Sequence, residues 1–249
     1  MFAFIRGWTD VDRTTQANLR LGAFLAFVAG ATNAGGFLAV GQYTSHMTGV
    51  LSSVADHLVL GQLTLAIAAA GSILAFVAGA MTTAILVNWG LRRRLHSAYG
   101  LPLLLESAAL LVFGIAGASI GVYEPLFLPL TVVLLCFIMG LQNAVITKIS
   151  KAEIRTTHVT GLVTDIGIEL GKLLYINPRA GSDPVLANRR KLRIHTVLVA
   201  CFFAGGLAGA LGFKYVGFKS TVPLAIGLWI LALRPFLRDL RQRLGAFGA

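Results

Sequence analysis

The sequence predicts an all-α polytopic membrane protein whose six transmembrane helices form two inverted three-helix repeats. Its composition, charge-free stretches of membrane length and a repeated polar motif predict this fold. Of the 249 residues, 56% are hydrophobic and only 12% are charged, whereas soluble globular chains carry about 25% charged residues. The composition therefore excludes a soluble globular protein and a disordered chain.

Long stretches without charged residues set the positions of the predicted helices. A membrane helix needs about 20 apolar residues to cross ~30 Å of hydrocarbon. Stretches without Asp, Glu, Lys or Arg cover 21–55, 57–91, 125–147 and 194–213. We expect membrane spans at 21–41, 64–88, 101–121, 126–147, 195–213 and 217–236. Lys219 and Arg234 lie near the ends of the last span, where long basic side chains reach the headgroups.

The distribution of basic residues predicts the orientation. Residues 1–20 lack the features of a secretory signal, so they predict a cytoplasmic N-terminal segment before a retained first span. With six crossings, 19 of the 21 basic residues fall on one side, and only Lys214 and Lys219 fall on the other. The positive-inside rule then places both termini, including a basic amphipathic tail at 237–249, in the cytoplasm.

The net charge of +11 follows from this asymmetry. The basic residues lie between apolar runs and not on one water-soluble face, so the sequence predicts no nucleic-acid partner. Anionic lipid headgroups are the expected partners of the basic loops. The oligomeric state stays open, a homo-oligomer included.

Three segments recur in the same order in the two halves. The pairs are FVAGATNA at 27–34 with FIMGLQNA at 137–144, TSHMTG at 44–49 with TTHVTG at 156–161, and FVAGAMTTA at 76–84 with FFAGGLAGA at 202–210. We infer a duplication, with repeat 1 at 21–121 and repeat 2 at 122–236, the latter lengthened by a cytoplasmic insert at about 178–191. Three crossings per repeat give the copies opposite orientations, as in many transporters and channels.

The repeated hexamer supplies the candidate site for a substrate or for gating. Its residues are Thr44, His46, Thr48 and Gly49 in the first copy and Thr156, His158, Thr160 and Gly161 in the second. We expect the hydroxyls of Thr48 and Thr160 to cap new helices, and the glycines to permit close backbone approach. The result is a broken or re-entrant segment after the first and fourth spans, whose exposed N–H groups suit an anion or polar ligand.

The hexamers have two interpretations. The first is the broken or re-entrant segment described above. In the second, the hexamers are extramembrane loops whose threonines cap interfacial helices. The histidines suit a proton carrier, a hydrogen-bond donor or a metal pair. Metal is the least supported of these, because no third ligand has a characteristic spacing, so no metal or cofactor is expected.

Several other polar residues lie in or beside apolar stretches. Glu106, within a predicted span, is a protonatable candidate, because a charge at mid-membrane costs about 3 kcal/mol or more. Its carboxyl is either protonated, paired with a histidine or amide, facing a polar pathway, or reaching headgroup water. Asp56 and Asp165 are further protonatable candidates, although a solvated face that includes Glu169 is the default. Asn33 and Asn143 are expected to bond across helices, with ligand contact as a second role.

These segments carry a resemblance to a known family. GATNAGGFLAVGQYTSHMTG and GLQNAVITKISKAEIRTTHVTGLVTDIG resemble the YoaK family, bacterial inner-membrane proteins of unknown function, over nearly the whole chain. The resemblance implies six helices but no reaction. The family pattern has aspartate where this chain has Asn33 and asparagine where it has Val50, so no proton- or cation-coupling role carries over at those positions.

Two function classes follow. The first is a bacterial inner-membrane transporter or channel for a small polar or anionic solute. The second is a non-transporting membrane protein: a sensor, a scaffold, or an enzyme acting on a lipid or quinone. No nucleotide loop, nucleophile elbow or zinc-protease motif occurs in the sequence, which favours the first class over an enzyme.

Overall fold

The computed structural model describes residues 8–9, 14–121, 123–150, 156–177 and 183–247. These residues form an all-α structure. The α-helices are α1 (Thr15–Val40), α2 (Met47–Val59), α3 (Leu63–Arg92), α4 (Gly100–Ala118), α5 (Glu124–Ile149), α6 (Val159–Leu174), α7 (Arg189–Val216) and α8 (Thr221–Phe247), with a 3-10 turn, η1 (Gly217–Ser220), before α8.

Five stretches of the described residues are long and apolar enough to cross a membrane. They are Gln16–Val40, Leu63–Arg92, Gly100–Ala118, Leu126–Ile149 and Arg189–Gln242. The fifth contains both α7 and α8, which η1 separates. These helices are those of a multi-pass membrane protein, as the composition predicts.

The helix ends follow local side-chain chemistry. α1 begins at Thr15, before the predicted span, because the Thr14 hydroxyl accepts a hydrogen bond from the backbone N–H of Ala17 at 3.2 Å. It ends at Val40, and the C-cap residue Gly41 adopts a left-handed conformation with φ of 76°. α7 begins inside the predicted insert because the Asn188 side chain accepts from the N–H of Lys191 at 3.0 Å.

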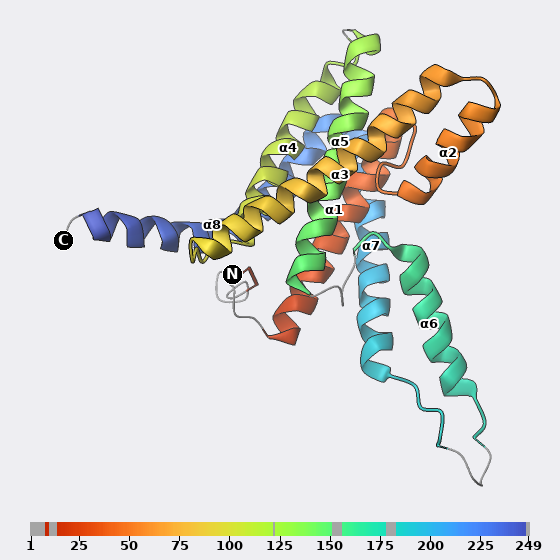
Figure 1. Cartoon of the computed structure of the whole chain (residues 1–249), viewed down its shortest axis with the longest axis vertical. Coiled ribbons are helices and arrows are strands. Elements are labelled where there is room, and N and C mark those ends of the chain that lie inside the picture. The colour runs from red at the N-terminus through yellow and green to blue at the C-terminus, as the bar shows by residue number, and fades with distance from the viewer. Residues whose placement is uncertain (1–7, 10–13, 122, 151–155, 178–182, 248–249) are drawn as a thin grey trace.

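Two close helix pairs form the centre of the molecule (Figure 1): α1 packs along α7, and α3 packs along α5. In the first pair, Gly30 faces the carbonyl oxygen of Phe202, and Gly205 faces that of Phe27, so closely that a Cβ at either glycine would collide with the oxygen. Glycine is required there because it alone brings two backbones this close.

The second pair repeats this arrangement. Gly140 faces the carbonyl oxygen of Phe76, and Gly79 faces that of Phe137, with the same collision for an added Cβ. Gly30, Gly79, Gly140 and Gly205 thus permit the close packing of the two central helix pairs.

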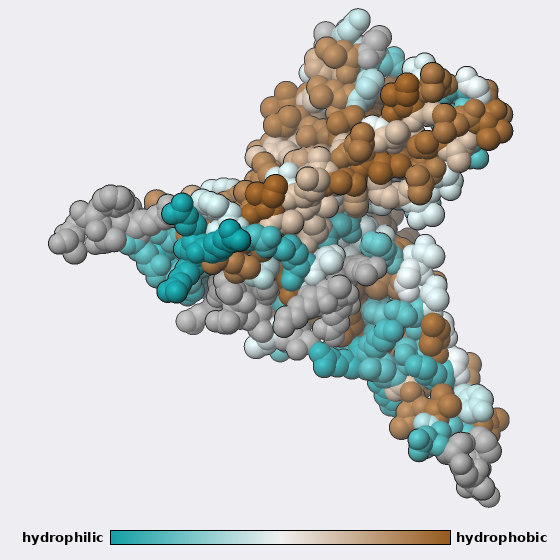
Figure 2. All heavy atoms as spheres, in the orientation of Figure 1, coloured by the Kyte–Doolittle hydropathy of each residue, from teal (hydrophilic) through white to brown (hydrophobic). Residues whose placement is uncertain are grey.

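Short helices accompany one member of each pair. α2 packs back against α3, and α6 against α7, so two helical hairpins extend away from the centre (Figure 1). Figure 2 shows apolar residues over α2 and α3, whereas hydrophilic residues gather along the α6–α7 hairpin and at the end of α3. The exposed arginines at these hydrophilic places include Arg92, Arg93 and Arg94 at the end of α3 and Arg189 and Arg193 on α7.

α4 and α8 form the remaining pair, antiparallel to each other, with α4 also packed on α5. Ser107 donates a hydrogen bond to the carbonyl oxygen of Ala225 at 2.8 Å across this pair. α8 runs without a break through Pro235 to Phe247, so the tail continues the last helix and does not begin a new one.

Asp239 attaches the end of α8 to the turn before α4. Its carboxylate accepts hydrogen bonds from the backbone N–H and ring Nδ1 of His96, at 2.8 and 2.9 Å, and from the N–H and hydroxyl of Ser97, at 2.9 and 2.6 Å. The carboxylate is nearly buried, so water cannot replace these partners without rearrangement.

We expect Asp239→Asn to lower the melting temperature of the detergent-purified protein by roughly 5 °C or more, because charge-assisted bonds to a buried carboxylate contribute about 1.5–3 kcal/mol each. Asp183→Asn, at an exposed position, is the matched control and should leave it unchanged. Equal melting temperatures for the two variants would contradict this role of Asp239.

Candidate functional site

The two copies of the hexamer lie in equivalent places, each in the segment between a long helix and a short one. In the first copy, α1 ends at Val40 and α2 begins at Met47, with His46 at the N-cap. In the second, α5 ends at Ile149 and α6 begins at Val159, with His158 at the N-cap. Each hexamer therefore ends in the first turn of a short helix.

Asparagines fix the position of both segments. The Ser45 hydroxyl donates to the Asn33 side-chain oxygen at 2.8 Å, and the Thr157 hydroxyl donates to that of Asn143 at 2.6 Å. The prediction that these asparagines bond across helices is wrong, because each accepts from the segment that follows its own helix. Asn143 also donates to the carbonyl oxygen of Met139 in the same helix.

The predicted capping role of the second threonine is also wrong. Thr48 and Thr160 lie inside the first turns of α2 and α6, and neither N-cap histidine forms a side-chain cap hydrogen bond. The backbone N–H groups at these two helix starts therefore receive no hydrogen bond from the N-cap side chain.

The two glycines of the hexamers differ. A Cβ at Gly49 would collide with the imidazole of His46. Because glycine has no side chain, the ring can lie over the first turn of α2. No atom lies within 4 Å of a Cβ built at Gly161, so the expected close approach is absent at that glycine.

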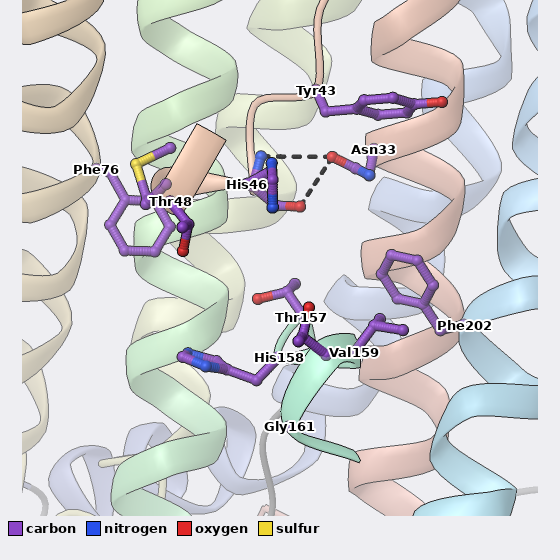
Figure 3. Close-up of a pocket in the computed structure, with 13 residues that line it drawn as sticks. Asn33, Tyr43, His46, Thr48, Phe76, Thr157, His158, Val159, Gly161 and Phe202 are labelled. Carbon is purple, nitrogen blue, oxygen red and sulfur yellow. Dashed lines mark hydrogen bonds between the residues drawn. The ribbon is translucent and has the colours of Figure 1, made fainter. Parts of the chain in front are cut away.

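Both helix starts face one cavity of about 630 Å³ (Figure 3). In this view His46 lies above the cavity centre and His158 below it, while Phe76 and Phe202 stand at its two sides. The lining from the first half includes Asn33, Tyr43, Ser45, His46, Met47, Thr48 and Phe76, and that from the second half includes Thr157, His158, Val159, Thr160, Gly161 and Phe202. The structure thus brings together residues about 110 positions apart in sequence.

Some predicted residues lie outside this lining. Thr44 and Thr156 are buried, and within the described part of the chain their hydroxyl oxygens have no hydrogen-bond partner. Asn143 is buried, and its side-chain oxygen accepts the hydrogen bond that positions Thr157 in the lining. Gly49 lies behind His46.

Sequence reasoning missed several lining residues. Ser45 and Thr157 lie inside the hexamers but differ in type, although both offer a hydroxyl. Phe76 and Phe202 begin the third repeated segment, so the same alignment contained the signal that identifies them as equivalent.

Glu106 lies away from the cavity, fully buried in α4. Neither carboxyl oxygen has a hydrogen-bond partner among the described residues. The alternative in which this carboxyl reaches headgroup water is therefore wrong, and no pairing with a histidine or amide is present in the described structure. Because an unpaired buried carboxylate is very costly, these surroundings favour the neutral acid.

The other acidic candidates also lie outside the described lining. Asp56 is exposed on α2. Asp165 on α6 pairs with Lys191 at 3.1 Å, and its second oxygen lies 3.6 Å from Nδ1 of His195. These contacts join α6 to α7.

Glu169 contradicts the expectation of a solvated charged face on α6. It is 2% exposed, accepts from the backbone N–H of Asn188 at 2.7 Å and pairs with Lys172 at 2.9 Å. The Asn188 N–H, together with the Lys172 ammonium, lowers the pKa of Glu169.

The described residues include no group of three or more His, Cys, Asp or Glu side chains that could hold a metal ion. The polar groups of the described lining are instead hydroxyls, amides, imidazoles and helix N-termini. This arrangement can bind a polar or negatively charged small molecule by hydrogen bonding.

Fold and site together define a multi-pass membrane protein with a cavity built from both halves of the chain. A family model described as "Protein of unknown function (DUF1275)" matches residues 21–234, and the chain belongs to this family. The match covers all of the lining residues described above. No curated protein and no solved structure matches the chain.

Proposed function

We propose that this chain is a bacterial inner-membrane transporter or channel for a small polar or anionic solute. The observation that carries the proposal is the single cavity that the two repeated hexamers share. Binding sites near the interface of two inverted repeats, at broken helices, are typical of transporters. A scaffold gives no reason for both copies to meet at one cavity.

Inverted repeats of 21–121 and 122–236 account for the contacts within the two central helix pairs and the two hairpins. An operation that exchanges α1 with α5 and α3 with α7 converts the α1–α7 pair into the α5–α3 pair. It also converts the contact of Gly30 with Phe202 into that of Gly140 with Phe76, residues that the sequence alignment pairs independently. In this arrangement α7 and α8 are separate crossings, which gives six in all.

Helix length supports a cavity near the middle of the membrane. α2 has 13 residues and α6 has 16, so at 1.5 Å per residue they are about 20 and 24 Å long. Half of a ~30 Å hydrocarbon layer is about 15 Å. Each short helix therefore suits a re-entrant segment that runs from the membrane centre to one surface.

The charge distribution supports cytoplasmic termini. The hydrophilic α6–α7 hairpin and the Arg92–Arg94 turn then face the cytoplasm, where anionic lipid headgroups attract their arginines, and the apolar α2–α3 hairpin extends toward the outer leaflet (Figure 2).

Cysteine labelling tests the orientation. In a Cys136→Ala, Cys201→Ala background, we expect a membrane-impermeant maleimide to label Gln62→Cys, in the α2–α3 turn, in spheroplasts from the outside. Asp183→Cys, before α7, should react only after the membrane is permeabilised. Labelling of both from the same side would overturn the inverted arrangement.

Release from proteoliposomes tests transport. Vesicles loaded with chloride, acetate, benzoate and glycine are diluted, and release of each solute is followed by ion chromatography. We expect at least one solute to leave about tenfold faster than from protein-free vesicles, and His46→Ala/His158→Ala to abolish the difference. His57→Ala is the control, because this α2 histidine bonds to Gln62 and is not part of the described lining.

Two results would contradict the proposal. One is release no faster than from protein-free vesicles for every solute. The other is unchanged release from the His46→Ala/His158→Ala variant, with the protein still folded by size-exclusion chromatography. Either would favour the non-transporting class of membrane protein.

A further inference from the structure

The walls of the cavity are largely apolar. Its volume of about 630 Å³ lies within the range of about 300–1,000 Å³ that is usual for pockets holding small organic molecules. The side chains of Phe76, Phe202, Met47 and Val159 supply the apolar part of its lining. A bare inorganic ion would leave most of this surface against water, whereas an organic molecule would cover it.

The polar side chains of the cavity are hydroxyls, imidazoles and one amide, and all of these types can donate hydrogen bonds. Among the described lining residues there is no Asp, Glu, Lys or Arg. The starts of α2 and α6 add backbone N–H groups that the N-cap side chains do not cap, and the positive ends of two helix dipoles. Such donors carry only partial positive charge, so they can compensate one negative charge on a ligand but not two. The positive helix ends also disfavour a cation.

The donors come in two equivalent sets. His46 and the start of α2 belong to one half, and His158 and the start of α6 belong to the other. A carboxylate has two equivalent oxygens, so each oxygen can accept from one set. Phe76 and Phe202, equivalent in the alignment, stand on opposite sides of the same cavity (Figure 3).

We propose that the cavity binds a small organic monocarboxylate, with its carboxylate between the starts of α2 and α6 and its apolar body between Phe76 and Phe202. The inference rests on the proposed function and names its solute class. Phe76 and Phe202 are the residues that select an organic anion over an inorganic one.

Binding to the purified full-length protein in detergent tests this inference without a transport assay. The probes are benzoate, chloride, benzyl alcohol and benzylamine, titrated by isothermal calorimetry. We expect benzoate to bind at least tenfold more tightly than each of the other three. Benzyl alcohol tests the need for charge, benzylamine its sign, and chloride the need for an apolar body.

Variants connect the preference to the cavity. Phe76→Ala/Phe202→Ala should weaken benzoate binding at least tenfold and chloride binding less than twofold. Phe27→Ala/Phe137→Ala is the matched control, since these aligned phenylalanines also supply the carbonyl oxygens at glycine contacts but are not part of the described lining. The control variant should bind benzoate as the unmodified chain does.

Each contrary outcome has a separate meaning. Chloride binding as tight as benzoate overturns the organic class and leaves an anion site. Tighter binding of benzyl alcohol or benzylamine overturns the carboxylate. Absence of benzoate binding, or equal loss in both phenylalanine variants, overturns the inference as a whole. The proposed function itself fails only on the two solute-release results described above, which are measured separately from benzoate binding.

Discussion

Replacing Gly30 with alanine is expected to abolish accumulation of the folded protein in the membrane. The new Cβ would collide with the carbonyl oxygen of Phe202, which belongs to the α7 backbone and cannot move aside as a flexible side chain can. α1 and α7 would have to separate along their length, with loss of packing on both. Gly140→Ala should have the same effect, through Phe76 and the α3–α5 pair.

Fluorescence-detected size-exclusion chromatography of a tagged chain measures this effect. Gly71→Ala is the matched control, because this glycine also lies within a long helix but has no atom within 4 Å of a built Cβ. We expect the control to behave like the unmodified chain or to be slightly more stable, since alanine is favoured over glycine in helices by about 0.5–1 kcal/mol. A monodisperse peak of normal height for Gly30→Ala would show that α1 and α7 do not pack as described.

The effect of substituting Glu106 on folding is expected to depend on the charge of the new side chain. Glu106→Gln keeps the shape of a neutral acid, so the variant should fold and melt within a few degrees of the unmodified protein. Glu106→Lys places a permanent charge at a fully buried position with no partner for it among the described residues, and we expect no folded protein.

Infrared spectroscopy gives a second readout for Glu106. The carbonyl stretch of a protonated carboxylic acid is resolved from that of a carboxylate, so the unmodified protein should have a protonated-acid band at neutral pH that Glu106→Gln lacks. Glu124→Lys, at an exposed acidic position on α5, is the control for charge reversal and should fold. Normal folding of Glu106→Lys would contradict the buried neutral acid.

The elements that periodic or repeated patterns mark could be predicted from the sequence. Charge-free stretches located the long apolar helices, because crossing hydrocarbon demands continuous apolar length. Aligning the hexamers indicated that each copy starts a short helix, and the structure has α2 and α6 there. The cavity lining includes four of the candidate residues of the hexamers: His46, Thr48, His158 and Thr160.

The remaining features depend on contacts that are remote in sequence or on a choice between near neighbours. In the sequence, the hydroxyls of Thr44 and Thr48 are equally able to cap the start of α2. The sequence therefore could not show that neither does. The bond of Asn33 to Ser45 depends on how the chain turns back after Gly41. The burial of Glu106 depends on helices that pack around α4 from other parts of the chain. These outcomes are set by tertiary packing, which leaves no periodic signal.

The two central helix pairs, α1 with α7 and α3 with α5, each join one helix from before residue 121 to one from after it. Neither half of the chain alone would cover its own glycine faces. Under the inverted arrangement proposed above, an ancestral gene encoding a single half would therefore have needed two copies of its product, inserted in opposite directions, to make a stable molecule. In the present chain, α1 and α3 are synthesised before α7 and α5, the helices that pack against them. Their glycine faces therefore stay uncovered in the membrane until these partners leave the ribosome.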